Sequence, residues 1–473
     1  MKGLTFFLLL VSFPALHSQP VTLRDTTNQY DYIIITVPEF VNACEPFKQH
    51  KETVRDFRTL IVDTTQIYTE FDSSATPQDN IRDFISYAGT FWKEPRPKFF
   101  LIAGTVNDIP NFLILFNGSP TPTYFNSDYY YCQNIYENDT TTTDFYIGRV
   151  PCRSSGELTN YLSKAIEYES NNILQAWMNN NLFVCENDSQ FGFYDAAVYL
   201  ADNLLPDYMR SRFTLDDSGS IYYGNKDSII NFVNDRGCAA IWFEGHHRDS
   251  FFISPDYFKL DDIQEFNNET KFFLTIFVAT QNSIIDTNTN MSAKMMMMSN
   301  SGSIGGIVSV GPSFWNVGNT MRQEYAERLF DPDIQSLGEV FTLDNLVPTG
   351  GIFEYMKKIT NLWADPSLKL KYDTTVGVEK VTGKLPESFS LYQNYPNPFN
   401  PSTTIKFALP TDSRVKINVY NTLGQLVETL VDKEMESGYH EVNFNASKLS
   451  SGVYLYQLQA GDYVSVKKML LLK

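Results

Sequence analysis

The chain has 473 residues, of which 43% are hydrophobic and 15% aromatic, enough for cores in about two to four domains. Its formal net charge is −18, so it carries no basic excess to neutralise nucleic acid or an anionic membrane. The five Cys residues form no CxxC pair, which argues against a cysteine-ligated zinc site. Their odd number leaves at least one thiol without a disulfide partner, and the sequence does not assign the pairs.

The first residues, MKGLTFFLLLVSFPALHS, are typical of a secretory signal peptide covering residues 1–18. Lys2 supplies the positive start, and the apolar stretch 4–16 is too short for a membrane span. No later segment reaches about 18 uninterrupted apolar residues, so no transmembrane helix is predicted. We therefore expect an exported protein.

Residues 19–375 alternate between apolar strands and amphipathic helices, which predicts an α/β domain with mainly parallel sheets flanked by helices. The domain divides into two α/β halves, approximately 19–175 and 176–375. Strands are expected at 31–41, 58–68, 98–110, 144–152, 180–188, 237–247, 271–281 and 303–311, and helices at 45–54, 76–89, 155–170, near 193–205 and near 292–299.

The composition changes near residue 376, where prolines and asparagines gather in LYQNYPNPFNPSTTIKFALP. Short alternating strands separated by turn signals follow up to the C-terminus. This pattern predicts a linker at 376–388 and an all-β sandwich at 389–473.

The C-terminal motifs LYQNYPNPFNPSTTIKFALP, VKINVYNTLGQLVETLV, LSSGVYLYQL and KKMLLLK resemble the type A sorting domain of type IX secretion. The resemblance implies contact with the type IX secretion machinery and a final location outside the cell or on its outer surface. It also implies that the domain is either removed or used for anchoring, which the sequence does not decide.

The α/β portion resembles the gingipain family of cysteine peptidases, with a gingipain- and caspase-like fold. The motifs that carry this resemblance occur in the family's order: DYIIITVPEF, DNIRDFISYA, FFLIAGTVNDIP, NSDYYY, DFYIGRVPC, FEGHH and LWADPSLKL. The resemblance implies a peptide or protein substrate or ligand. It also allows structural calcium, although no spaced Asp loop is visible; no other cofactor or metal is expected.

His246 matches the histidine that acts as general base and acid in this family. It follows an apolar strand, where loops of open α/β sheets gather ligands, and Gly245 before it would let the backbone turn tightly. The family's nucleophilic Cys belongs on the next strand. Aligning FVATQNSIID with the family pattern places Thr280 at the Cys position, 34 residues after His246.

A threonine is a poor replacement for this cysteine. A thiol has a pKa near about 8.5 that an imidazolium can lower, whereas an aliphatic hydroxyl ionises far higher. The β-methyl of Thr280 also restricts χ1. The oxyanion region departs from the family too, because His247 and Ser283 stand where relatives have glycines, and Thr105 stands where many have Asp.

The resemblance implies an acidic residue that orients the histidine. Asp144, just before FYIGR, is the first candidate, and Asp128 in NSDYYY is the alternative. The sequence thus favours a secreted gingipain-like protein whose catalysis is impaired. Two alternatives stay open: an active peptidase that uses Thr280 or a nucleophile elsewhere, and a non-catalytic surface binding or structural protein. Substrate preference and oligomeric state cannot be read from the sequence.

Overall fold

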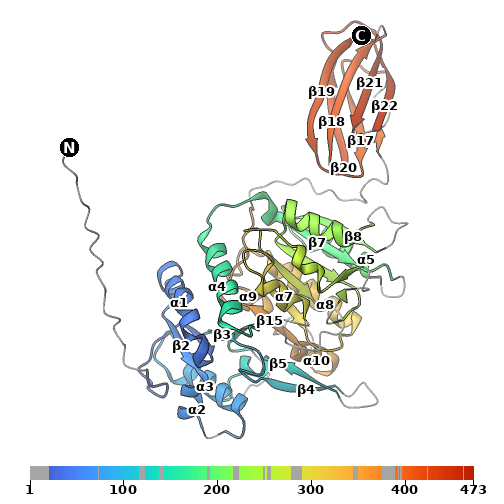
Figure 1. The fold of residues 1–473 in the computed structure, drawn as a ribbon. Coiled ribbons are helices and arrows are strands. Elements are labelled where there is room, and N and C mark those ends of the chain that lie inside the picture. The colour runs from blue at the N-terminus through green and yellow to red at the C-terminus, as the bar shows by residue number, and fades with distance from the viewer. Residues whose placement is uncertain are drawn as a thin grey trace, which may run out of the picture.

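The computed structural model describes most of the chain after the N-terminal segment (Figure 1). The described residues are 21–72, 74–116, 123–137, 143–188, 192–216, 223–248, 251–252, 257–278, 290–344, 350–374, 389–391, 394, 397–422, 424–461 and 463–472. The predicted signal peptide at 1–18, the predicted linker at 376–388 and both Thr280 and Ser283 lie outside these residues.

The first half of the α/β body is built on a four-stranded parallel sheet of order β2-β1-β3-β6. Its strands are β1 (Tyr32–Thr36), β2 (Thr59–Asp63), β3 (Phe99–Ala103) and β6 (Tyr146–Val150). The helices between them are α1 (Val41–Val54), α2 (Thr64–Glu70) and α3 (Pro77–Phe91). Successive residues of β1 enter two different hydrophobic clusters, so both faces of the sheet are buried, as its continuous apolar runs predicted.

The second half contains a six-stranded sheet of order β15-β14-β13-β9-β7-β8. Its strands are β7 (Asn180–Cys185), β8 (Arg210–Leu215), β9 (Ala240–Glu244), β13 (Phe273–Phe277), β14 (Ser303–Ser309) and β15 (Thr360–Ala364). All neighbours run parallel except β15, which is antiparallel to β14. The helices of this half and the preceding connection are α4 (Ser155–Ser170), α5 (Phe193–Asn203), α6 (Lys226–Asn231), α7 (Met291–Met297), α8 (Trp315–Leu329), α9 (Leu337–Phe341) and α10 (Gly351–Ile359).

Shorter elements complete the body. They are the hairpin β4 (Phe112–Phe116) and β5 (Thr123–Ser127), the small sheet β10 (His247–Arg248), β11 (Phe251–Phe252) and β12 (Phe258–Lys259), the 3-10 turns Pro38–Phe40, Tyr129–Cys132, Ala176–Asn179 and Asp262–Glu265, and the π-helical turn Phe232–Arg236. Several predicted strands are shorter than expected: the strand predicted at 31–41 is β1, which ends at Thr36, and the strand predicted at 98–110 is β3, which ends at Ala103. The strand predicted at 58–68 ends at Asp63, because Asp63 caps α2 by accepting a hydrogen bond from the Gln66 backbone at 3.0 Å.

The two sheets meet where β6 lies against β15. A Cβ on Gly148 of β6 would stand 2.1 Å from the Ala364 carbonyl oxygen, so only glycine fits this contact. The next residue after β15, Asp365, accepts hydrogen bonds from Tyr32 at 2.7 Å and from the buried Lys51 ammonium at 2.6 Å. The LWADPSLKL stretch therefore joins the C-terminal end of the α/β body to its first strand and helix.

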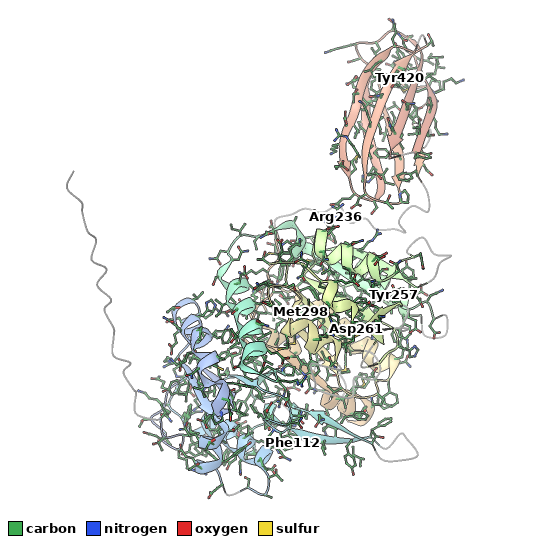
Figure 2. All side chains as sticks on the ribbon, viewed as in Figure 1. Phe112, Arg236, Tyr257, Asp261, Met298 and Tyr420 are labelled. Atoms are coloured by element: carbon green, nitrogen blue, oxygen red, sulfur yellow. The ribbon has the colours of Figure 1, made fainter. Side chains whose placement is uncertain are left out.

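The C-terminal region is an antiparallel β-sandwich with its own hydrophobic core, drawn in red in Figure 1. Its two sheets have the orders β16-β17-β20 and β19-β18-β21-β22. The strands are β16 (Ser390–Leu391), β17 (Ser402–Leu409), β18 (Ser413–Asn421), β19 (Leu426–Met435), β20 (Gly438–Asn445), β21 (Gly452–Ala460) and β22 (Tyr463–Leu471). Arg236, labelled on the α/β body in Figure 2, forms an exposed ion pair with Asp412 of the sandwich. Such pairs contribute little stability.

None of the described helices is both long enough and apolar enough to cross a lipid bilayer.

Candidate active site

The candidate site lies at the carboxyl edge of β7 and β9, which are parallel neighbours in the six-stranded sheet. Cys185 at the end of β7 pairs with Glu244 at the end of β9. The Glu186 backbone then donates to the Glu244 carbonyl oxygen at 2.8 Å, which extends the ladder by one bond. As a result Glu186 and His246, which are distant in sequence, leave the sheet side by side.

A single carboxylate oxygen of Glu186 holds His246 in two ways. Glu186 Oε2 accepts the His246 backbone N–H at 2.7 Å and lies 2.8 Å from the ring atom Nδ1. An ionised carboxylate only accepts hydrogen bonds, so Nδ1 is the donor and Nε2 is the basic nitrogen of the neutral ring. The histidine side chain is 43% exposed and the glutamate 18%, so the pair is open to solvent.

Aromatic packing fixes the other side of the ring. Phe193, the first residue of α5, meets the His246 ring edge to face, with centroids 5.3 Å apart. Trp315, the first residue of α8, packs on Phe193 at 4.5 Å, and the Arg322 guanidinium lies over Trp315 at 4.6 Å. Hydrogen bonding and packing together hold the imidazole in one orientation.

The glycine before His246 is required by packing. Gly245 is not among the glycines with a positive φ, so backbone strain does not explain it. A Cβ at this position would stand 2.6 Å from Glu186 Cβ and 3.0 Å from Glu186 Oε2. Glycine is thus needed to let Glu186 approach, which makes Gly245 part of the Glu186–His246 arrangement.

A buried ion pair lies under the site. Glu244 and Arg322 are both fully buried, with Oε2 and Nε 3.1 Å apart. Burial raises the pKa of Glu244 to about 7, against the lowering effect of Arg322. Arg322 also donates to the Val278 carbonyl oxygen at 3.3 Å, just beyond the end of β13. The pair therefore connects the ends of β9 and β13.

The two aspartates predicted to orient the histidine, Asp128 and Asp144, form hydrogen bonds with other residues. Both carboxylate oxygens of Asp128 accept from Arg149 at 2.7 Å, in a buried pair of the first half. Asp144 accepts the Asn134 backbone N–H at 2.9 Å. The residue in contact with Nδ1 is Glu186. It was missed although FVCEND shows the same signal as FEGHH, an apolar strand that ends in polar residues.

Of the remaining predicted residues, His247 and Thr105 lie in the described structure, and Thr280 and Ser283 do not. His247 begins β10, where it pairs with Phe252. Thr105 donates to Asp108 through its backbone at 3.0 Å and its hydroxyl at 2.7 Å. The chain carrying Thr280 and Ser283 leaves the described region after Val278. That point is close to the end of β9, because the Phe277 and Phe243 rings stack at 4.0 Å.

All five cysteines are free and buried. Burial raises the pKa of every thiol above its usual value, to about 12 for Cys44. Cys185 is closest to the site in the sheet register, since it pairs with Glu244, but burial and that carboxylate both disfavour its thiolate. All five thiols therefore lie in buried surroundings that disfavour the thiolate.

A histidine with a carboxylate on Nδ1, at the carboxyl edge of parallel strands, has the geometry that the histidine and acid of a nucleophile–histidine–acid site require. The model of peptidase family C25 matches residues 25–371, and the chain belongs to that family. The model of the secretion system C-terminal sorting domain matches residues 393–472. That domain implies interaction with the secretion machinery and type IX export to the cell surface or the medium.

Solved structures agree on the fold. The complex of Porphyromonas gingivalis RgpB pro- and mature domains is 16% identical, with a TM-score of 0.59, over 93% of this chain and 100% of that one. The Arg specific cysteine proteinase gingipain R is also 16% identical, with a TM-score of 0.58, over 93% and 98%. At such identities the likeness shows the gingipain-like fold alone. A comparison with curated proteins finds none that matches the sequence.

Proposed function

We propose that this protein is a secreted member of peptidase family C25 that binds peptides but hydrolyses them poorly, because Thr280 replaces the nucleophilic cysteine. The observation that carries the proposal is the half-exposed His246 held by Glu186, in a chain whose five cysteines are all buried. The base half of the site is present, and no accessible thiol accompanies it.

The strand register supports Thr280 as the residue at the nucleophile position. In the described ladder the three paired residues of β13, Leu274 to Ile276, each face the residue of β9 that is 34 positions earlier, as Ile276 does Trp242. The same offset relates Thr280 to His246. A nucleophile carried by β13 and a base carried by β9 would thus leave the sheet at the same level. This agreement is independent of the motif alignment.

The chemistry of the two residues explains the proposed loss of activity. Glu186 can stabilise an imidazolium, and an imidazolium stabilises a neighbouring thiolate, which is an ion pair formed before substrate binds. A hydroxyl must lose its proton during attack, to a base and oxyanion donors in correct alignment. We propose Glu186, in place of Asp144 or Asp128, as the acid that orients His246.

The direct test is peptide hydrolysis measured with the exported protein and a broad fluorogenic peptide library. We expect little wild-type turnover and thiol-inhibitor-sensitive turnover in Thr280→Cys. Thr280→Ser is the matched control, because it removes the β-methyl without supplying a thiol. His246→Ala added to Thr280→Cys should abolish the restored turnover. If Thr280→Cys alone does not restore turnover, His247→Gly and Ser283→Gly are added. Glycine at these positions allows the backbone N–H donors of the oxyanion region to adopt the required conformation.

Three results would replace the proposal. Clear wild-type turnover that is lost in Thr280→Ala would mean that the hydroxyl is an active nucleophile. Clear wild-type turnover that survives Thr280→Ala would place the nucleophile elsewhere in the chain. If peptides neither bind to the wild type nor are cleaved by any variant, the protein is a surface binding or structural protein that keeps only the fold.

A further inference from the structure

We propose that Glu186, Asp188 and His246 form a binding site for one divalent transition-metal ion, with zinc the preferred metal. One ligand atom from each residue lies within 4.8 Å of the other two, and all three residues are half-buried. The inference goes beyond the proposed peptide binding. It depends on described residues alone and does not require Thr280 or any hydrolysis.

The three ligands are held by separate backbone contacts. Glu186 is held by its hydrogen bond to Glu244. Between the two carboxylates, the Asn187 backbone donates to Asp216 at 2.7 Å. The Asp188 carbonyl oxygen accepts the Gly192 N–H at 3.0 Å, at the start of α5. With the His246 ring packed on Phe193, all three side chains extend from ordered backbone, which lowers the entropy lost on metal binding.

The electrostatics of the site favour a cation. Two carboxylates converge on one imidazole, and among the described ion pairs Glu186 has His246 as its partner and no Lys or Arg. A dipositive ion bound among the three ligand atoms would attract both carboxylates.

The ligand set selects the kind of metal. Imidazole nitrogen suits zinc, copper, iron and nickel, whereas calcium and magnesium prefer oxygen ligands alone. Zinc bonds to histidine nitrogen and carboxylate oxygen at about 2.0–2.2 Å, and three protein ligands leave a fourth position for water. Nδ1 and Glu186 Oε2, now 2.8 Å apart, need to separate only slightly to share such an ion. The ion would take the place of the Nδ1 proton.

The proposal has a functional consequence. A metal on Nδ1 would occupy the contact that orients His246 for proton transfer, so metal binding and histidine-assisted catalysis would exclude each other. If the nucleophilic cysteine is absent, as proposed above, metal binding at His246 costs the protein no catalytic activity. The sequence did not reveal the site because its two parts lie on β7 and β9, about sixty positions apart.

The test is a titration of the chelator-treated, full-length exported protein with zinc, in competition with a chromophoric chelator. Cobalt provides a second readout, because its visible absorption reports a low-symmetry nitrogen and oxygen site. We expect one zinc per chain and no displacement by millimolar calcium or magnesium. Asp188→Asn and His246→Ala should each weaken binding by about 100-fold or more, beyond the usual effect of a lost outer-shell contact.

The matched controls are Asp195→Asn, an exposed acid in the first turn of α5, and His440→Ala in the sandwich, and neither should change the affinity. Equal thermal unfolding of all variants will show that the ligand substitutions have not unfolded the chain. Three results would overturn the proposal: absence of stoichiometric zinc binding, binding that survives both ligand substitutions, and binding lost in either control.

Discussion

Two Glu–His pairs in this molecule have nearly the same contact geometry and very different surroundings. His50 Nε2 lies 2.9 Å from Glu169, and His246 Nδ1 lies 2.8 Å from Glu186. In the first pair the side chains are only 6% and 4% exposed, against 43% and 18% in the second. A hydrogen-bonded histidine is therefore not informative by itself, and its neighbours decide what it can do.

The buried pair belongs to a charge network that holds the fold together. Glu169 also accepts from Lys51 at 2.8 Å and from Arg55 at 2.6 Å, and Lys51 reaches Asp365. Every charge in this cluster has opposite charges beside it. Glu186 has no comparable set of basic neighbours among the described residues, so the second pair can still engage a proton, a substrate or a metal ion. The comparison predicts that the two pairs respond differently to mutation and to pH.

The largest expected effect is on stability. Lys51→Met leaves Glu169 and Asp365 buried with less compensating charge, and breaking such pairs typically costs about 3–5 kcal/mol. His246→Ala removes a half-exposed ring and should cost about 1 kcal/mol or less. Chemical denaturation of the α/β body will measure both. Equal losses of unfolding free energy in the two variants would remove the distinction between the pairs.

A second, smaller effect concerns acid. The basic neighbours of Glu169 outweigh its burial and hold its pKa well below the usual 4.5. A lowered folded-state pKa stabilises the fold above the usual value, and this contribution is lost as the pH falls below about 4.5 toward the folded-state pKa. Glu169→Gln should therefore flatten the stability profile in that acidic range. Glu186→Gln is the comparison variant; a larger flattening there than in Glu169→Gln would contradict the account.

A third effect separates packing from hydrogen bonding at the exposed pair. Gly245→Ala would place a methyl group 2.6 Å from Glu186 Cβ, and such overpacking typically costs about 1–3 kcal/mol. We expect it to displace Glu186 and to weaken zinc binding. Gly156→Ala in α4 is the matched control, because the nearest atom is 3.7 Å away and alanine favours helix. Unchanged zinc affinity in Gly245→Ala would argue against the metal site.

The smallest expected effect is on the chemical reactivity of the two histidines, which can be measured without unfolding the protein. Diethyl pyrocarbonate modifies accessible neutral imidazoles, so His246 should be carbethoxylated well before the buried His50. Peptide mass mapping of a time course will give both rates. Zinc should slow modification of His246 and leave His440 of the sandwich unaffected. Faster modification of His50 than of His246 would reverse the assignment of the buried and exposed pairs.

Much of the fold was predictable because local patterns determine it. The sequence correctly predicted the alternation of strands and helices, the cap of α3 at Thr76 and the turn-separated strands of the sandwich. The ends of several strands were wrong, such as those of β1, β2 and β3. In β2 the prediction ran on into TTQIY, because the side-chain cap of Asp63 that begins α2 was not recognised.

The site was predictable in part for a related reason. His246 could be located from AAIWFEGHH, since an apolar strand that ends in Gly-His is a local signal. Its partner Glu186 depends on β7 and β9 being neighbours, and the order of strands in a sheet is not written in any single segment. By sequence Asp144 was the first candidate for the orienting acid and Asp128 the alternative, yet tertiary contacts direct Asp144 to the Asn134 backbone and Asp128 to Arg149.

The central claim is that the Glu186–His246 pair is intact although the nucleophilic thiol has been lost. The most direct test is covalent labelling of Thr280→Cys with peptidyl chloromethyl ketones, followed by mass spectrometry of the intact protein. We predict one adduct, on the introduced thiol, at a rate that falls sharply when Glu186→Gln or His246→Ala is added, and no adduct on the wild type. Labelling of the wild type at one of its five native cysteines, or labelling of Thr280→Cys that ignores both substitutions, would contradict the account.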